Sequence, residues 1–257
     1  MDLIPEAVRL IVSDGIGHLV LDRPPVNALN FAAQNRLLEL ADEITHRTDI
    51  RAVLITGNNG NFSAGADLKE LRDVDQAEMA IRAPRMQTAL ARLAAIAKPV
   101  AVALDGVALG GGCELALCAD RRFASRRLSI GLTEVAVGVI PGGGGTRRLA
   151  RLVGHSVAKD LIFNATTLDA GAALRIGLVD VVTDDPAAAA QDWLARLAAG
   201  PARALAAAKR SIDFLAESAD AGLAYETAAL IEVFGTADRE RGINAFVAKR
   251  PPSFLGR

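Results

Sequence analysis

The sequence has little of what marks several large classes of protein. Two cysteines in 257 residues are too few for a disulfide-stapled secreted domain. The histidines, His18, His46 and His155, are scattered, and neither a His-Glu-x-x-His pattern nor a cysteine pair at ligand spacing is present. We therefore expect no metal site. A formal net charge of -1, without a run of five like charges, gives no basic footprint for nucleic acid or an anionic membrane. The expected partner is a small molecule.

Long apolar runs are also missing. No apolar stretch reaches the roughly 18 residues that a membrane span requires, and the first ten residues lack the basic start and apolar run of a secretory signal. Cys113 and Cys118 lie five apart in an apolar helical run, where a bridge or a shared metal has poor geometry. We expect them to be small buried side chains of a cytoplasmic protein.

What is present indicates a folded chain in which strands alternate with helices. Hydrophobic residues make up 51% and charged residues 23% of the chain, as in ordinary globular proteins. Two apolar runs around Ser13–Gly15 predict a hairpin, Asn30 precedes a stretch with helical spacing, and Asp49–Gly57 predicts a buried strand. Further helices are predicted over 86–97 and 113–120, and strands over 99–104 and 121–125. After Val182 the alanine-rich sequence predicts a separate helical appendage.

Nucleotide-binding and hydrolase motifs are incomplete. Gly15-Ile16-Gly17 lacks a third glycine, and the glycine run 142–145 is followed by Thr-Arg in place of the Lys-Ser/Thr of a P-loop, so no nucleotide cofactor is implied. The segment 61–65 (NFSAG) lacks only the first glycine of a serine-hydrolase elbow. A hydrolase with Ser63 as nucleophile and one of the histidines as base stays an alternative.

Three segments place glycine beside a carboxylate. In the first, Gly110–Gly112 stands directly before a predicted helix, where open backbone N–H groups can hold an oxyanion. Glu114 follows in the first helical turn, where it either faces the same ligand or merely complements the helix dipole.

In the second segment, 62–70 (FSAGADLKE), small residues allow close approach of the backbone to a ligand. The Ala64 N–H is a second candidate oxyanion donor. We expect Asp67 to cap the following helix, with Glu70 completing a capping box.

In the third segment, Glu134 lies in an otherwise apolar stretch ahead of a glycine run. Such surroundings favour the protonated carboxyl that an acid catalyst needs, although a surface glutamate on a loop would give the same pattern.

Taken together, the segments resemble the enoyl-CoA hydratase/isomerase family, also called the crotonase family. The resemblance covers nearly the whole chain in ordered matches, namely Leu21–Asn30 (LDRPPVNALN), Phe62–Glu70 (FSAGADLKE), Lys98–Asp120 (KPVAVALDGVALGGGCELALCAD), Glu134–Leu149 (EVAVGVIPGGGGTRRL) and Phe246–Arg257 (FVAKRPPSFLGR).

The resemblance implies roles for four of these residues. The N–H groups of Ala64 and Gly111 would form the oxyanion hole for a thioester carbonyl, and Glu114 and Glu134 would handle water and proton, as in the hydratases. Both glutamates are present, 20 residues apart (134 − 114). The expected activity is therefore hydration of a 2-enoyl-CoA. The alternatives are an isomerase that shifts the double bond with one glutamate, or a non-catalytic acyl-CoA binding protein.

The resemblance also implies an α/β fold, a crotonase-type spiral of ββα units with a C-terminal α-helical oligomerisation region. We divide the chain into a spiral core (1–195) with the acyl-CoA site and a helical trimerisation region (196–257), and expect a homotrimer or a dimer of trimers. Coenzyme A belongs to the substrate, and no separate cofactor is expected.

Coenzyme A contacts are expected at Val26, Ala28, Ala66, Asp67 and Leu68. Several relatives carry a lysine soon after the terminal aromatic residue, to hold the phosphates, whereas Phe254 is followed by Leu255. Lys249, Arg250 or Arg257 would have to substitute for it.

Overall fold

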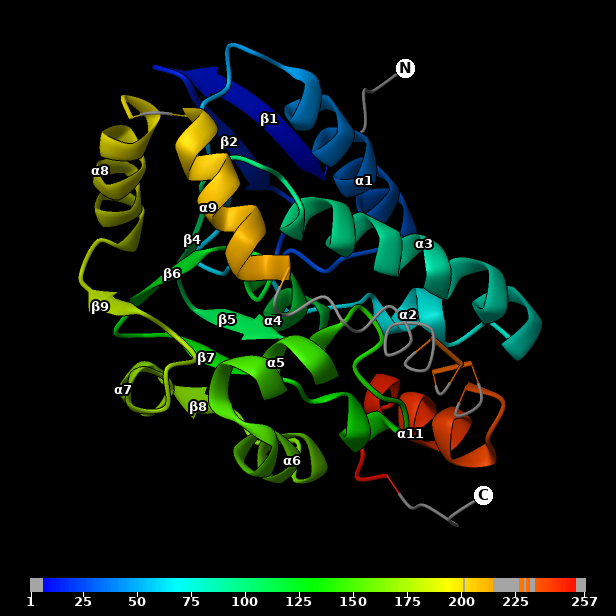
Figure 1. Ribbon diagram of the computed structural model, residues 1–257. Coiled ribbons are helices and arrows are strands. Elements are labelled where there is room, and N and C mark those ends of the chain that lie inside the picture. The colour runs from blue at the N-terminus through cyan, green and yellow to red at the C-terminus, as the bar shows by residue number, and fades with distance from the viewer. Residues whose placement is uncertain (1–6, 201, 215–226, 229, 232–233, 253–257) are drawn as a thin grey trace.

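A computed structural model describes residues 7–200, 202–214, 227–228, 230–231 and 234–252 (Figure 1). The strands are β1 (Val8–Ser13), β2 (Ile16–Leu21), β3 (Ala52–Gly57), β4 (Val100–Leu104), β5 (Val107–Leu109), β6 (Arg121–Ser125), β7 (Ser129–Gly131), β8 (Leu168–Asp169) and β9 (Val181–Thr183). The helices are α1 (Phe31–His46), α2 (Leu68–Leu71), α3 (Gln76–Ala94), α4 (Gly111–Ala116), the 3₁₀ turn η1 (Glu134–Val137), α5 (Gly145–Val153), α6 (His155–Phe163), α7 (Ala170–Arg175), α8 (Pro186–Ala198), α9 (Ala202–Phe214) and α11 (Ala237–Val247).

The main sheet has six strands in the order β1-β2-β3-β4-β6-β9. Only β1 and β2 pair antiparallel, as the predicted hairpin requires, and the other neighbours are parallel. Because successive side chains of a strand point to opposite faces, Val53 and Ile55 join the core beneath α1 and α3, while Ala52 and Leu54 pack with residues of α8. Helices therefore cover both faces of the sheet (Figure 1).

Local expectations about the elements are largely confirmed. Asn30 caps α1 by accepting a hydrogen bond from the Ala33 N–H, and the strands predicted over 99–104 and 121–125 are β4 and β6. The expectation that all helices after Val182 form a separate appendage is wrong for α8. Its Ala190 and Leu194 are fully buried against the main sheet, so the change in composition does not mark a structural boundary there. The division at residue 195 and the trimerising role stay predictions.

A second sheet, in the order β5-β7-β8, brings together the segments that carried the sequence motifs. Isolated bridges extend this contact by joining Ser63 to Ala108 and Leu29 to Ala66. The two glycine-containing segments around Gly65 and Gly111 thereby lie side by side, although 46 residues separate them (111 − 65). None of the described helices is long and apolar enough to cross a membrane.

Candidate active site

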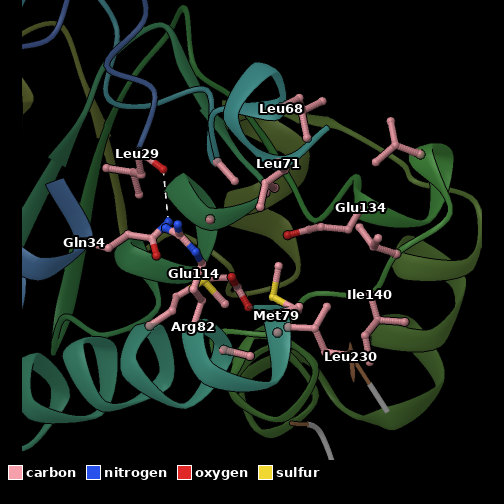
Figure 2. Close-up of a pocket in the computed structure, with 18 of the residues that line it drawn as sticks. Leu29, Gln34, Leu68, Leu71, Met79, Arg82, Glu114, Glu134, Ile140 and Leu230 are labelled. Atoms are coloured by element: carbon pink, nitrogen blue, oxygen red, sulfur yellow. Dashed lines mark hydrogen bonds between the residues drawn. The ribbon is translucent and has the colours of Figure 1, made fainter. Parts of the chain in front are cut away.

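A cavity of about 300 Å³ opens where these segments meet α1, α3 and η1 (Figure 2). Its wall is mainly aliphatic, and it includes backbone at Ala66 and Gly111. Among the described residues, five polar side chains line it, those of Gln34, Arg82, Glu114, Thr133 and Glu134. Both glutamates singled out in the sequence therefore face one apolar cavity of the kind that holds a small-molecule ligand.

Two backbone N–H groups of the cavity wall are available to a ligand. Within the described part of the chain, neither the Ala66 N–H nor the Gly111 N–H donates to a protein acceptor. They are neighbours, because a Cβ built on Gly111 would lie 3.6 Å from the Ala66 nitrogen. This pair can serve one oxygen atom.

The expectation that Ala64 supplies one of these donors is wrong. The Ala64 N–H donates to the Val26 carbonyl at 2.9 Å, so it is already engaged in joining two loops. Nothing in the sequence separates the candidates, since Ala64-Gly65-Ala66 is symmetrical about its glycine. Ala66, predicted only as a coenzyme A contact, is the residue whose N–H is open.

Glycine at position 65 permits the approach of the two segments. Gly65 has a φ of +90°, and a Cβ there would lie 2.5 Å from the Leu109 carbonyl oxygen and 3.0 Å from the Gly111 nitrogen. Any side chain would push the segments apart.

Glu114 is anchored by a second glycine run. The residue is 2% exposed, and its Oε1 accepts hydrogen bonds from the Gly143 N–H at 2.7 Å and the Gly145 N–H at 2.9 Å. A Cβ at either glycine would lie 2.8 Å from a carboxylate oxygen of Glu114. The glycine run at 142–145 thus has a defined function that the sequence did not reveal: it makes room for this carboxylate and orients it.

Glu134 starts η1 and reaches the cavity from the opposite side (Figure 2). Its Oε1 would lie 3.3 Å from a Cβ built on Gly110, whose φ is +51°. The Gly110 N–H donates to the Gly131 carbonyl, which ties the turn before α4 to the strand that leads to η1. The sequence-based alternative of a surface glutamate on a loop is not supported, because Glu134 lines the cavity that Glu114 also lines.

Asp67 and Glu70 were both expected to cap α2. Asp67 does so by accepting from the Lys69 N–H at 3.1 Å, and it also pairs with Arg23 at 2.7 Å. The capping-box expectation for Glu70 is wrong, because its Oε2 accepts from the Phe31 N–H at 2.7 Å and so joins α2 to α1.

Of the five residues expected to contact coenzyme A, two line the cavity and three do not. Leu68 and Ala66 line the cavity. The Val26 carbonyl accepts a hydrogen bond from the N–H of Ala64, a residue that lines the cavity. The Ala28 carbonyl accepts from Arg23 Nη1 at 3.2 Å. Arg23 links Ala28 to Asp67 by donating to both, and a coenzyme A contact at any of the five residues stays a prediction.

Two of the three basic residues considered for the phosphates are described. Lys249 and Arg250 follow the C-cap residue of α11, Ala248, and both are exposed to solvent. Arg257 and the Phe254-Leu255 pair lie outside the described residues. A phosphate-binding role for Lys249 or Arg250 stays a prediction.

Asn27 is a structural residue that sequence reasoning missed. It is 1% exposed, and its Nδ2 donates to the carbonyls of Asn58 at 2.9 Å and Asn61 at 2.8 Å. The main-chain carbonyl of Asn27 accepts from Ser63 Oγ at 2.7 Å. Ser63 is fully buried and does not line the cavity, so the structure does not support the serine-hydrolase alternative.

The fold and site define a class: an α/β protein with paired N–H donors and two glutamates around an apolar cavity. A model of the enoyl-CoA hydratase/isomerase family matches residues 12–257. The chain belongs to this family.

Individual members of the family are similar to the chain in sequence and in structure. A protein of Mycobacterium bovis named "Probable enoyl-CoA hydratase EchA17" is 41% identical over 239 residues, which cover 90% of this chain and 92% of the relative. The crystal structure of carnitinyl-CoA hydratase from Mycobacterium avium has a TM-score of 0.87 at 30% identity, covering 98% of this chain and 99% of that one. An enoyl-CoA hydratase/isomerase from Mycobacterium paratuberculosis has a TM-score of 0.89 at 26% identity, covering 95% and 99%.

Proposed function

We propose that the protein is an enoyl-CoA hydratase, which reversibly adds water across the 2,3 double bond of a 2-enoyl-CoA to give a 3-hydroxyacyl-CoA. The observation that carries the proposal is the presence of both Glu114 and Glu134 on one cavity that also presents two open N–H groups. A double-bond isomerase needs one glutamate, and a binding protein needs neither.

The thioester carbonyl oxygen would accept hydrogen bonds from the Ala66 and Gly111 N–H groups. Attack of water on C3 moves negative charge onto this oxygen, so donors fixed at that place stabilise the enolate-like state more than the substrate. Removing one such donor typically costs about 3 kcal/mol of the activation barrier. The oxyanion role is thus assigned to Ala66 in place of Ala64.

The glutamates would divide the proton transfers. Glu114, held in place by the glycine run, orients the water and takes its proton, and Glu134 delivers a proton to the α-carbon. Each positioned acid or base contributes about 10²–10⁴-fold. Hydration transfers no electrons to an acceptor, so the proposal includes no cofactor besides the coenzyme A of the substrate.

The test is to follow the absorbance of the conjugated thioester when the protein is mixed with 2-enoyl-CoA substrates of several chain lengths. Loss of absorbance with formation of the 3-hydroxyacyl product is expected. Failure at every chain length would refute the proposal, and conversion of a 3-enoyl-CoA into the conjugated thioester without hydration would establish the isomerase instead.

Two variants test the roles. Glu114→Gln and Glu134→Gln are each expected to lower kcat by about 10²-fold or more, while calorimetric binding of a saturated acyl-CoA changes little. Equal loss of binding would point to structural roles. Glu39→Gln, at an exposed position of α1, is the matched control and should leave both quantities unchanged.

The homotrimer or dimer of trimers implied by the family is also proposed here. It is supported by exposed apolar side chains on neighbouring helices α5 and α6, where Leu152 and Val157 are each 38% exposed and Phe163 is 69% exposed. Light scattering after size exclusion should give three or six chain masses. A monomer at micromolar concentration would contradict this part of the proposal.

A cytoplasmic location is proposed on different grounds. Cys113 and Cys118 are both free and buried, which fits a compartment that keeps thiols reduced. Fractionation of cells expressing a tagged chain should recover it with the cytoplasmic markers.

A further inference from the structure

Three polar side chains on the cavity have no part in the proposed reaction, those of Gln34, Arg82 and Thr133, and the first two come from facing helices. Gln34 comes from α1 and Arg82 from α3, and both line the cavity that Glu114 and Glu134 share. Figure 2 shows their head groups converging on the side opposite Glu134, close to Glu114. In a wall that is mainly apolar, such a pair marks a place for a polar group of the ligand.

The Arg82 guanidinium is held in place from two sides. Its Nε donates to Glu78 Oε1 at 2.7 Å and its Nη2 binds the same oxygen. Its carbon Cζ lies 3.6 Å from the centre of the Phe31 ring, so the guanidinium also stacks on an aromatic face. Within the described chain no acceptor binds Arg82 Nη1, which leaves these N–H groups for a ligand.

Gln34 presents the complementary group. Its Nε2 donates to the Leu29 carbonyl at 3.1 Å, so the nitrogen end of the amide faces Leu29. No donor from the described residues reaches Gln34 Oε1, which remains an acceptor. Arg82 Nη1 and Gln34 Oε1 thus form a donor and acceptor pair on adjacent helices.

The charge balance favours an uncharged ligand group. Arg82 is the only cation among the described residues of the cavity wall, and Glu78 neutralises it. The same wall carries the carboxyl groups of Glu114 and Glu134. An anionic group would enter without a net positive partner, whereas a hydroxyl group accepts one hydrogen bond and donates another.

We propose that the acyl group of the preferred substrate carries a hydroxyl group remote from the thioester, which accepts from Arg82 Nη1 and donates to Gln34 Oε1. The inference rests on the proposed hydratase function and specifies its substrate class. Gln34 and Arg82 would be specificity-determining residues, because their hydrogen bonds discriminate among acyl groups that react by the same chemistry.

The experiment compares pairs of 2-enoyl-CoA substrates of equal chain length, one ending in a hydroxyl and one in a methyl group. For at least one chain length, kcat/KM is expected to be about tenfold higher for the hydroxylated member, the worth of one hydrogen bond to a charged donor. Calorimetric Kd values of the matching saturated acyl-CoA pairs should show the same preference without turnover. An ω-carboxyl series should be disfavoured.

Two variants locate the preference. Arg82→Met and Gln34→Leu keep much of the side-chain volume and are each expected to bring the hydroxyl-to-methyl ratio of kcat/KM, and of affinity, close to one. Arg85→Met, at an exposed position of the same helix, and Asn35→Ala, next to Gln34, are the matched controls and should retain the wild-type ratio.

Several outcomes would overturn the inference. One is a ratio near one in the wild type at every chain length. Another is a uniform loss with all substrates in Arg82→Met, which would place the guanidinium against the pantetheine arm of coenzyme A. A third is a preference for the ω-carboxyl series. If neither the hydroxyl series nor the methyl series is hydrated, the proposed function fails, and the Kd pairs still decide whether the site selects a hydroxyl group.

Discussion

Adding one methyl group behind Glu114 tests whether its anchoring by the glycine run matters for catalysis. A Cβ at Gly145 would lie 2.8 Å from Glu114 Oε1, 2.9 Å from its Cγ and 3.1 Å from Leu132 Cδ1. Gly145 begins α5 with a φ outside the left-handed region, so Gly145→Ala introduces no backbone strain of its own. The perturbation is confined to contacts with the Glu114 and Leu132 side chains.

The expected displacement follows from these distances. Ordinary contact begins at 3.4 Å, so Glu114 Oε1 must retreat by about 0.6 Å (3.4 − 2.8) and lengthen its 2.9 Å bond to the Gly145 N–H. A catalytic group misplaced by about 1 Å can cost 10²-fold in rate. We expect kcat to fall by about 10- to 100-fold, and overpacking to lower the free energy of unfolding by about 1–3 kcal/mol.

The assay is steady-state hydration of a 2-enoyl-CoA, with urea unfolding measured in parallel. Gly171→Ala is the matched control: it lies in α7, and its Cβ would come no closer than 3.4 Å to another atom. It should keep full activity and stability. Wild-type kcat in Gly145→Ala would refute the reasoning that close glycine contacts position Glu114, and a rise in KM alone would do so as well.

Three further predictions concern stability and reactivity. Burial lowers the pKa of His18, so the unfolded chain binds a proton at this residue more readily than the folded chain does. The contribution of neutral His18 to stability is therefore lost as the pH falls through the ordinary histidine range. His18→Gln should flatten the fall in the urea midpoint between about pH 7 and 5, and the control His46→Gln should not. Burial raises the pKa of the Cys113 and Cys118 thiols, so both stay protonated at about pH 8; a thiol reagent should label them only after unfolding, and rapid labelling of the native protein would contradict their burial. Asn27→Ala leaves buried carbonyls without their donor and should lower the free energy of unfolding by about 2–4 kcal/mol, measured by urea titration; a change below about 0.5 kcal/mol would show that water replaces the amide.

The sequence by itself determined the elements that depend on nearby residues. The hairpin around Ser13–Gly15 and the Asn30 cap of α1 follow from turn chemistry and capping, which act over a few residues. The sequence also identified the family and both glutamates, because several motifs match that family in the same order along the chain.

Tertiary structure decided the contacts that depend on segments distant in the chain. Ala66 is the open donor only because the Val26 carbonyl engages Ala64, and Gly145 matters only because Glu114 folds against it. α8 joins the core since the sheet leaves one face for it to cover. Hydrogen-bond partners and packing faces are set by three-dimensional proximity, which residue spacing along the chain does not encode. The motifs could therefore be found in the sequence, but the role of each donor and acceptor atom could be assigned only from the fold.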